Sequence, residues 1–151
     1  MKVKNIFRFV FLIAFVFTSF VSCDSDESKS TVDEVTDTVK DGAWRISYFY
    51  DSGKDKTANY VGYNFIFGDN TVMTASREIS TSYNGQWFVT KSTSDNELFS
   101  TIFKISMSPT DIFQDLNEDW KVIENTGTSL TLKDDSQGQT AIDYLTFQKI
   151  E

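Results

Sequence analysis

From Gly42 onward, apolar and polar residues alternate with a period of two in one short segment after another. This pattern is typical of strands with one buried face, because successive side chains of a strand point to opposite sides. The expected strands cover residues 44–50, 60–67, 71–74, 86–90, 97–106, 119–124, 129–133 and 141–149. The pattern predicts an all-β domain of eight short antiparallel strands, arranged as a barrel or a sandwich.

The pattern also predicts which side chains share a face. Four residues of the first strand are expected to lie on one face: Trp44, Ile46, Tyr48 and Tyr50. Val61, Tyr63, Phe65 and Phe67 are expected to do the same in the second strand. If the last strand pairs with the first, the sheet closes into a barrel without a free edge. Large inward residues would fill such a barrel, and the candidates are Phe65, Phe67, Trp87, Phe103 and Phe147.

Three connections interrupt the strands. Gly68-Asp69-Asn70 is a tight hairpin signal, and residues 77–84 are expected to form a loop. One short helix is predicted over residues 109–116, where Ser108 is the candidate N-cap and Pro109 takes the first helical position.

The N-terminus is typical of a secretory signal peptide. Lys2, Lys4 and Arg8 precede the uncharged run 9–17, and the only cysteine, Cys23, follows a few residues later. The uncharged stretch is shorter than the roughly 20 residues of a membrane-spanning helix. The segment resembles a bacterial lipoprotein signal, although Phe20 stands where leucine is preferred. We expect residues 1–22 to be removed and Cys23 to carry acyl chains such as palmitate; plain secretion is the alternative.

Residues 23–40 are polar and acidic, and they predict a flexible tether between the membrane and a domain spanning residues 41–151. A short helical turn near Val35 and Val39 is the one structure considered within it. Asp24, Asp26 and Glu27 resemble an export signal that places lipoproteins of Bacteroidota on the cell surface; a solvated linker is the alternative. The expected location is the outer membrane, on its periplasmic or cell-surface side.

Composition excludes several classes of function. The chain has no histidine and a formal net charge of −8. Ser-His-Asp and Cys-His catalysis and zinc sites with nitrogen or sulfur ligands are therefore excluded. Nucleic acid is an unfavourable partner for such an acidic chain. The sequence predicts no enzymatic activity, no cofactor and no metal site.

Two patterns among the acidic residues point weakly to a calcium site and to acid–base catalysis. Asp115, Asn117 and Asp119 have the spacing that begins a calcium loop, but Trp120 occupies the sixth position, where such loops need glycine. A helix-to-strand turn is the favoured interpretation. The carboxylate pairs, such as Asp134-Asp135, lie in polar stretches and are expected to be solvated, which argues against acid–base catalysis.

Tyrosines are the remaining candidates for ligand contact, because each combines an apolar ring with a polar tip. The candidates are Tyr48, Tyr50, Tyr60 and Tyr63. A place in the core or at the barrel rim is the alternative for each of them.

Gly42-Ala43-Trp44 at the start of the first strand resembles the Gly-x-Trp motif of lipocalins, and the triplet recurs as Gly85-Gln86-Trp87. With the 65–70 hairpin and the segments from Asp119 to Phe147, the chain is similar to lipocalin-like lipoproteins of flavobacteria. The resemblance implies a small eight-stranded barrel with Trp44 packed across one end. It implies binding of a small apolar or amphipathic ligand at the open end. The alternative is a filled barrel with a structural or assembly role, bound to another envelope protein.

Overall fold

The computed structural model describes residues 30–78, 81–92, 100–108, 111–136 and 141–151. In these parts of the chain, nine strands form one antiparallel sheet in the order β2-β1-β3-β4-β5-β6-β7-β8-β9, which β1 and β9 close by pairing with each other. The strands are β1 Trp44–Asp51, β2 Lys54–Asp55, β3 Tyr63–Phe67, β4 Val72–Arg77, β5 Thr81–Lys91, β6 Thr101–Met107, β7 Asp119–Asn125, β8 Ser129–Asp134 and β9 Asp143–Lys149. Because β2 only extends the turn after β1, the barrel has eight strands, as predicted.

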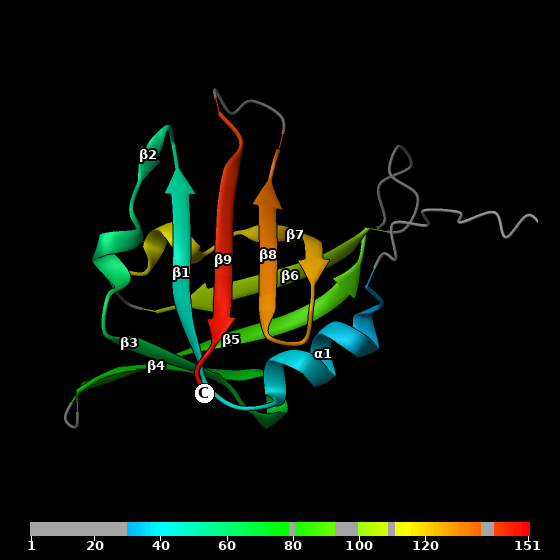
Figure 1. Cartoon of the computed structure of the whole chain (residues 1–151), viewed down its shortest axis with the longest axis horizontal. Helices are drawn as coiled ribbons and strands as arrows, with labels where there is room; N and C mark the ends of the chain where they lie inside the picture. Colours follow the sequence, from blue (N-terminus) through cyan, green and yellow to red (C-terminus); the bar gives the residue numbers. More distant parts are fainter. Residues whose placement is uncertain (1–29, 79–80, 93–99, 109–110, 137–140) are drawn as a thin grey trace, which may run out of the picture.

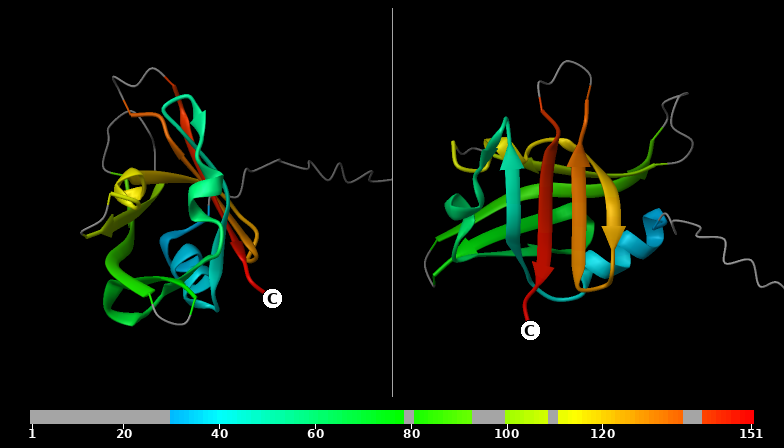
Figure 2. Two further views of the ribbon diagram at one scale, coloured as in Figure 1. Left: turned by 90° about the vertical axis from the view of Figure 1, so that its left-hand side faces the viewer. Right: turned by 45° about the horizontal axis from the view of Figure 1, so that its top comes forward.

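The barrel is flattened into two layers whose strands cross at a steep angle (Figures 1 and 2). One layer holds β1, β9 and β8, and the other holds β3 to β6. The core lies between the layers. The five residues expected to point inward are all buried: Phe65, Phe67, Trp87, Phe103 and Phe147.

A bulge in β1 changes which of its side chains face the core. Ile46 pairs with Phe147 and Tyr48 with Thr146, so Ser47 is the extra residue. The extra residue reverses the alternation after it. Trp44, Ile46 and Phe49 are therefore buried, while Tyr48 is 42% exposed. The prediction that Tyr48 and Tyr50 share a face with Trp44 and Ile46 is wrong.

Other strand limits differ from the predictions in smaller ways. The hairpin at Gly68-Asp69-Asn70 is confirmed: the 3₁₀ turn Asp69–Thr71 joins β3 to β4. The predicted loop over residues 77–84 is wrong in part, because β5 already begins at Thr81 and pairs with β4 from there. Val61 precedes β3 and is 64% exposed, so it does not join the buried face of that strand.

The α-helix of the described chain lies in the segment predicted to be a tether. Helix α1 spans Val32–Lys40 and begins with a capping box: the Thr31 hydroxyl accepts from the Glu34 amide, and the Glu34 carboxylate accepts from the Thr31 amide. Val35 and Val39, one turn apart, are fully buried. The helical turn considered near Val35 and Val39 is thus present, as part of a longer helix, whereas the interpretation of residues 31–40 as a flexible tether is wrong and the folded unit begins before residue 41.

Helix α1 packs into one end of the barrel, beside β3 and β5 (Figure 1). The indole N–H of Trp44 donates to the Val39 carbonyl over 2.9 Å. The Asn125 amide, at the end of β7, donates to the Thr38 hydroxyl over 3.1 Å. These bonds fix the helix to β1 and β7.

The opposite end holds the 3₁₀ turns Thr57–Tyr60 and Gln114–Leu116 (Figures 1 and 2). The short helix predicted over residues 109–116 is confirmed only at its end: residues 114–116 form the second of these 3₁₀ turns, and residues 109–110 lie outside the described chain. Phe113 and Leu116 are fully buried. The two turns, with Phe113, close this end of the barrel like a plug. The Trp120 indole donates to the Leu116 carbonyl over 3.1 Å, which joins the second turn to β7.

Among the described residues, no helix has both the length and the apolar character needed to cross a bilayer.

Candidate functional site

The structure separates the four candidate tyrosines into two pairs. Tyr60 and Tyr63 belong to the core, with 1% and 5% of their surface exposed. The Tyr60 hydroxyl donates to the Ile112 carbonyl over 2.9 Å, and burial raises the pKa of this phenol. Both rings lie near Phe113, at 6.1 Å and 5.2 Å between centroids. Tyr60 and Tyr63 therefore help to plug the barrel end at which a ligand was expected.

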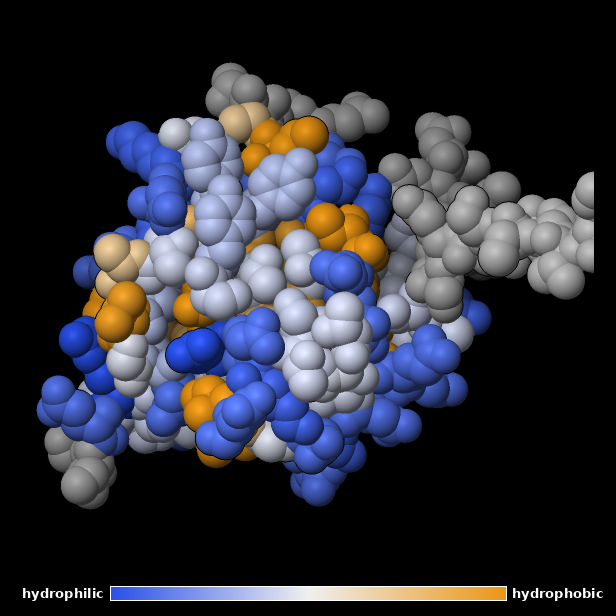
Figure 3. Space-filling model, in the orientation of Figure 1, coloured by the Kyte–Doolittle hydropathy of each residue, from blue (hydrophilic) through white to orange (hydrophobic). Residues whose placement is uncertain are grey.

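Tyr48 and Tyr50 lie on the outer face of β1 because of the bulge at Ser47. The register places Tyr50 opposite Tyr144 of β9, which also points outward. Figure 3 views this face, where hydrophobic groups interrupt the polar surface. Tyr48 and Ile142 are among the exposed large side chains of the described chain. Tyr144 was not among the candidates from the sequence, although the alternation in residues 141–149 could have placed it on the face opposite to that of Leu145.

Aromatic rings fill the interior between the two layers. Phe67 lies at the centre, with ring centroids 5.6 Å from Trp87, 5.4 Å from Phe103 and 5.4 Å from Phe147. Phe65 continues the contacts toward Phe113 at 6.2 Å. Most of these pairs meet edge to face, a favourable arrangement for aromatic rings. In the described part of the chain, aromatic rings thus pack against one another through the interior, from Trp87 and Phe103 to Phe113.

The three residues with the spacing of a calcium loop, Asp115, Asn117 and Asp119, each bind another group of the protein. Asp115 forms an ion pair with Lys56, and Asp119 forms one with Lys104. The Asn117 side chain bonds the backbone of Met107 through both its oxygen and its nitrogen, at 2.6 Å and 3.0 Å. These contacts support the turn interpretation.

Buried carboxylates meet where β1, β8 and β9 end. Asp134 and Asp143 face each other across β8 and β9 and are only 5% and 6% exposed. The expectation that Asp134 is solvated is therefore wrong. Asp143 accepts from the Ser52 amide over 2.8 Å, and Asp134 accepts from the Ser136 amide over 2.9 Å. Each carboxylate holds a turn in place, which is a structural role.

The surroundings of Asp143 disfavour its charged form. Burial raises the pKa of this carboxyl first, and the negative charges of Asp51 and Asp134 raise it further. The Ser52 amide acts in the opposite direction. Lys56 pairs with Asp51, and Glu118 adds another negative charge nearby.

We expect Asp143→Asn to stabilise the protein at pH 7 by about 0.5 to 1 kcal/mol, because like charges opposite each other in a sheet are destabilising. Asparagine keeps the acceptor for Ser52. A raised folded pKa means that the native state binds protons more readily than the unfolded chain, so the wild type loses stability as pH rises through that pKa. The difference in free energy of unfolding between Asp143→Asn and the wild type should therefore shrink as pH falls toward 4. Urea unfolding at several pH values measures it.

Asp111→Asn is the control, since Asp111 is exposed and the same change of charge there relieves no buried repulsion. If Asp143→Asn raised the free energy of unfolding equally at every pH, or lowered it at pH 7, the repulsion between the two carboxylates would not destabilise the protein.

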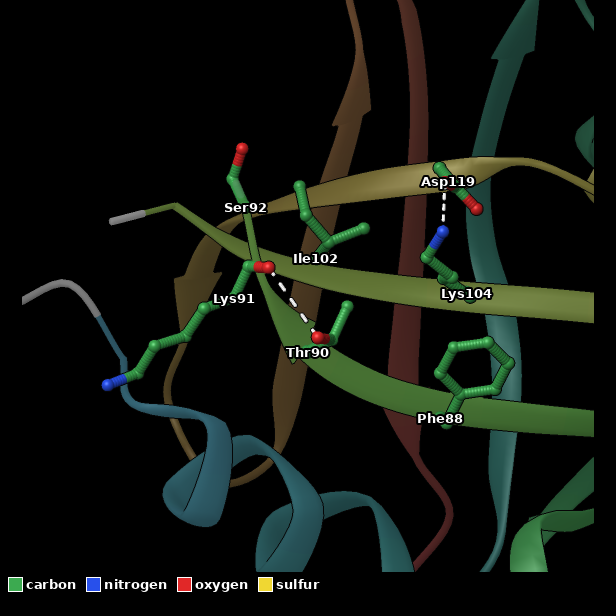
Figure 4. Close-up of a pocket in the computed structure, with 7 residues that line it drawn as sticks. All are labelled: Phe88, Thr90, Lys91, Ser92, Ile102, Lys104 and Asp119. Carbon is green, nitrogen blue, oxygen red and sulfur yellow. Dashed lines mark hydrogen bonds and ion pairs between the residues drawn. The ribbon is translucent and has the colours of Figure 1, made fainter. Parts of the chain in front are cut away.

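A shallow groove of about 530 Å³ lies on the outer face of β5, β6 and β7 (Figure 4). Lys104 pairs with Asp119 across its floor and lies 5.8 Å from the centre of the Phe88 ring. The groove is completed by Thr90, Lys91, Ser92 and Ile102. Its central cation and anion pair with each other, and the groove presents the apolar Phe88 and Ile102 beside the polar Thr90, Lys91 and Ser92.

Cys23, the predicted lipidation site, and the signal peptide over residues 1–22 lie outside the described residues. Their roles remain predictions from the sequence.

Comparison with known proteins gives one structural likeness. No protein-family model matches the chain, and no curated protein matches it. Among solved structures, the chain is similar to a DUF4847 family protein from Bacteroides vulgatus, with 16% identity and a TM-score of 0.48. The match covers 77% of this chain and 97% of that one. A likeness at this level carries no information on function.

Proposed function

We propose that this protein is a non-catalytic lipoprotein of the bacterial envelope, of lipocalin-like type, held to the outer membrane by an acylated Cys23. Its barrel is filled and acts through its outer surface, on which another envelope protein binds. This is the assembly role weighed above as the alternative to a ligand carrier.

The observation that carries the proposal is the filled interior. An eight-stranded barrel is just wide enough either to be packed by its own side chains or to hold one small ligand. Here Phe67 and its aromatic neighbours occupy the middle. Helix α1 lies at one end, and Tyr60 with Phe113 lies at the other. This arrangement favours the outer surface over a ligand at the open end.

The anchor is supported by the sequence alone. A basic start, an uncharged run and a single cysteine followed by acidic residues are the elements of a lipoprotein signal. Two or more acyl chains on Cys23 would give a stable attachment, since one chain binds membranes only marginally.

Native mass spectrometry of the full-length gene product, purified from its own membranes in detergent, tests both parts of the proposal. We expect the mass of residues 23–151 plus the acyl chains on Cys23, and no further bound molecule. A Cys23→Ala variant made in the same host is the control, and it should leave the membrane fraction.

The two parts fail separately. An unacylated chain, or a Cys23→Ala variant that stays with membranes after a salt wash, would contradict the anchor. A reproducible extra mass that is released on denaturation would contradict the filled barrel and would restore the ligand-carrier function.

A further inference from the structure

The part of the chain that the structure describes begins beside the groove on the outer face of β5, β6 and β7. The Ser30 carbonyl, just before α1, accepts a hydrogen bond from the Thr101 hydroxyl of β6 over 2.7 Å. In the strand register Thr101 lies opposite Lys91, and Ile102 lies opposite Thr90. Lys91, Thr90 and Ile102 all line the groove. The chain therefore enters the folded domain at one end of this groove.

The exposed apolar side chains of the groove lie close to this entry point. Phe88 is 45% exposed, and it lies opposite Lys104, three residues along β6 from Thr101. Residues of a strand rise about 3.3 Å each, and paired strands lie about 4.8 Å apart, so the backbone of Phe88 is about 11 Å from that of Thr101. Ile102 is partly exposed and nearer still. An apolar surface thus adjoins the point at which the chain enters.

The predicted anchor is separated from this point by a short piece of chain. Residues 24–29 alone stand between Cys23 and Ser30. Seven residues span at most about 25 Å, whatever their conformation. With the acyl chains of Cys23 in a bilayer, the entry point is therefore held within about 25 Å of the membrane surface. A short linker gives an effective concentration on the order of millimolar, so even a weak contact between the groove and the bilayer is well populated.

We infer that the groove face of β5 and β6 docks on the bilayer in which Cys23 is anchored. The Phe88 ring and Ile102 enter the interface between headgroups and acyl chains, where apolar side chains of peripheral proteins are favourable. The long stem of Lys91 lets its ammonium stay at headgroup level.

The inference rests on the proposed function, since it needs the acylated Cys23, and it adds which face of the barrel turns to the membrane. The outer face of β1, β9 and β8 belongs to the other layer (Figure 2). It therefore turns away from the membrane and is left for the envelope protein.

Charge does not drive this contact. Lys104 and Asp119 pair with each other on the floor of the groove. Lys91 points toward the start of α1, whose first turn carries Asp33 and Glu34 (Figure 4). We therefore expect the contact on zwitterionic phosphatidylcholine, and we expect it to change little as the salt concentration rises.

The test uses the acylated protein, purified from its own membranes and placed in phosphatidylcholine vesicles that contain a nitroxide-labelled lipid. Cys23 is the only cysteine and its thiol is acylated, so a fluorophore attaches only to an introduced cysteine. Thr90→Cys places the fluorophore in the groove, and Thr146→Cys places it on the outer face of β9; both threonines are partly exposed. We expect the lipid to quench the fluorophore at residue 90 and not at residue 146.

Two further changes test the cause of the contact. Phe88→Ser, added to the Thr90→Cys protein, removes the most exposed apolar ring of the groove and should lower the ratio of docked to undocked barrels about tenfold. Tyr48→Ser is the matched control, because Tyr48 is 42% exposed on the opposite layer and its loss should leave quenching unchanged. Inserting about 20 Gly and Ser residues after residue 29 lengthens the linker about fourfold and should lower the same ratio about eightfold.

Absence of quenching at residue 90, equal quenching at residues 90 and 146, or quenching that Phe88→Ser leaves unchanged would each overturn the inference. Flotation of the same vesicles judges the proposed anchor separately. Protein that floats with the vesicles is anchored, whatever the quenching shows. Protein that does not float would contradict the anchor, and with it the inference.

Discussion

Replacing Trp44 with alanine is expected to lower the free energy of unfolding by about 3 to 5 kcal/mol, the range for deleting a large buried aromatic side chain. Trp44 is completely buried, and its indole N–H bonds the Val39 carbonyl. The substitution therefore leaves a cavity between the barrel and helix α1 and removes a bond between them. Small domains are stable by only about 5 to 15 kcal/mol, so the variant should be partly unfolded under mild conditions. Urea unfolding measures the loss.

Ile66→Ala is the matched control, because Ile66 lies in the neighbouring β3 but is 47% exposed. It should cost about 1 kcal/mol or less. Trp44→Phe separates the two contributions: it keeps an aromatic ring but leaves the Val39 carbonyl without its donor, and an intermediate loss is expected. Equal losses for Trp44→Ala and Ile66→Ala would show that Trp44 does not hold the helix end together.

The second large effect is expected from the double substitution Val35→Asp and Val39→Asp. Both valines are fully buried, and burying each contributes about 1.5 to 2 kcal/mol. Carboxylates cannot remain there unpaired, so α1 should leave the barrel end. We expect a loss of about 3 to 4 kcal/mol in urea unfolding, stronger binding of a hydrophobic dye, and faster proteolysis of residues 30–41.

Val32→Asp is the control for this helix. Val32 is only partly buried and begins the first turn, where an acidic side chain is favourable to the helix dipole. Its effect should be well under half of that of the double variant. If the double variant kept its wild-type stability and dye binding, α1 would be the dispensable tether that the sequence predicts.

The location of the strands could be predicted because it depends on local patterns. Period-two alternation placed a predicted segment at each strand of the barrel, and the turn at Gly68-Asp69-Asn70 was recognised from its residue types. The aromatic residues expected to point inward do so. Where the local pattern was interrupted, prediction failed. Nothing in the sequence of β1 indicates the extra residue Ser47, so Tyr48 and Tyr50 were both predicted on the buried face of the strand instead of the outer one.

Helix α1 was anticipated only as a short helical turn near Val35 and Val39 within a tether, for a different reason. Its sequence is polar apart from a few valines, so composition favours a tether. The capping box from Thr31 to Glu34 and the spacing of Val35 and Val39 were available as signals. Two valines stabilise so short a helix only when a complementary apolar end receives them, and that end exists only once the barrel has closed.

The outer surface depends even more on tertiary structure. Tyr50, Tyr144, Lys133 and Lys121 are far apart in the chain, and they form one row only through the register of three strand pairs. The burial of Asp134 opposite Asp143 arises in the same way. By itself, the sequence determined the all-β class, the turn at Gly68-Asp69-Asn70 and most of the core, because these follow from the chemistry of neighbouring residues. Only the tertiary structure decided that the barrel is filled, that α1 belongs to it, and which side chains meet on its surface, because those depend on contacts between distant residues.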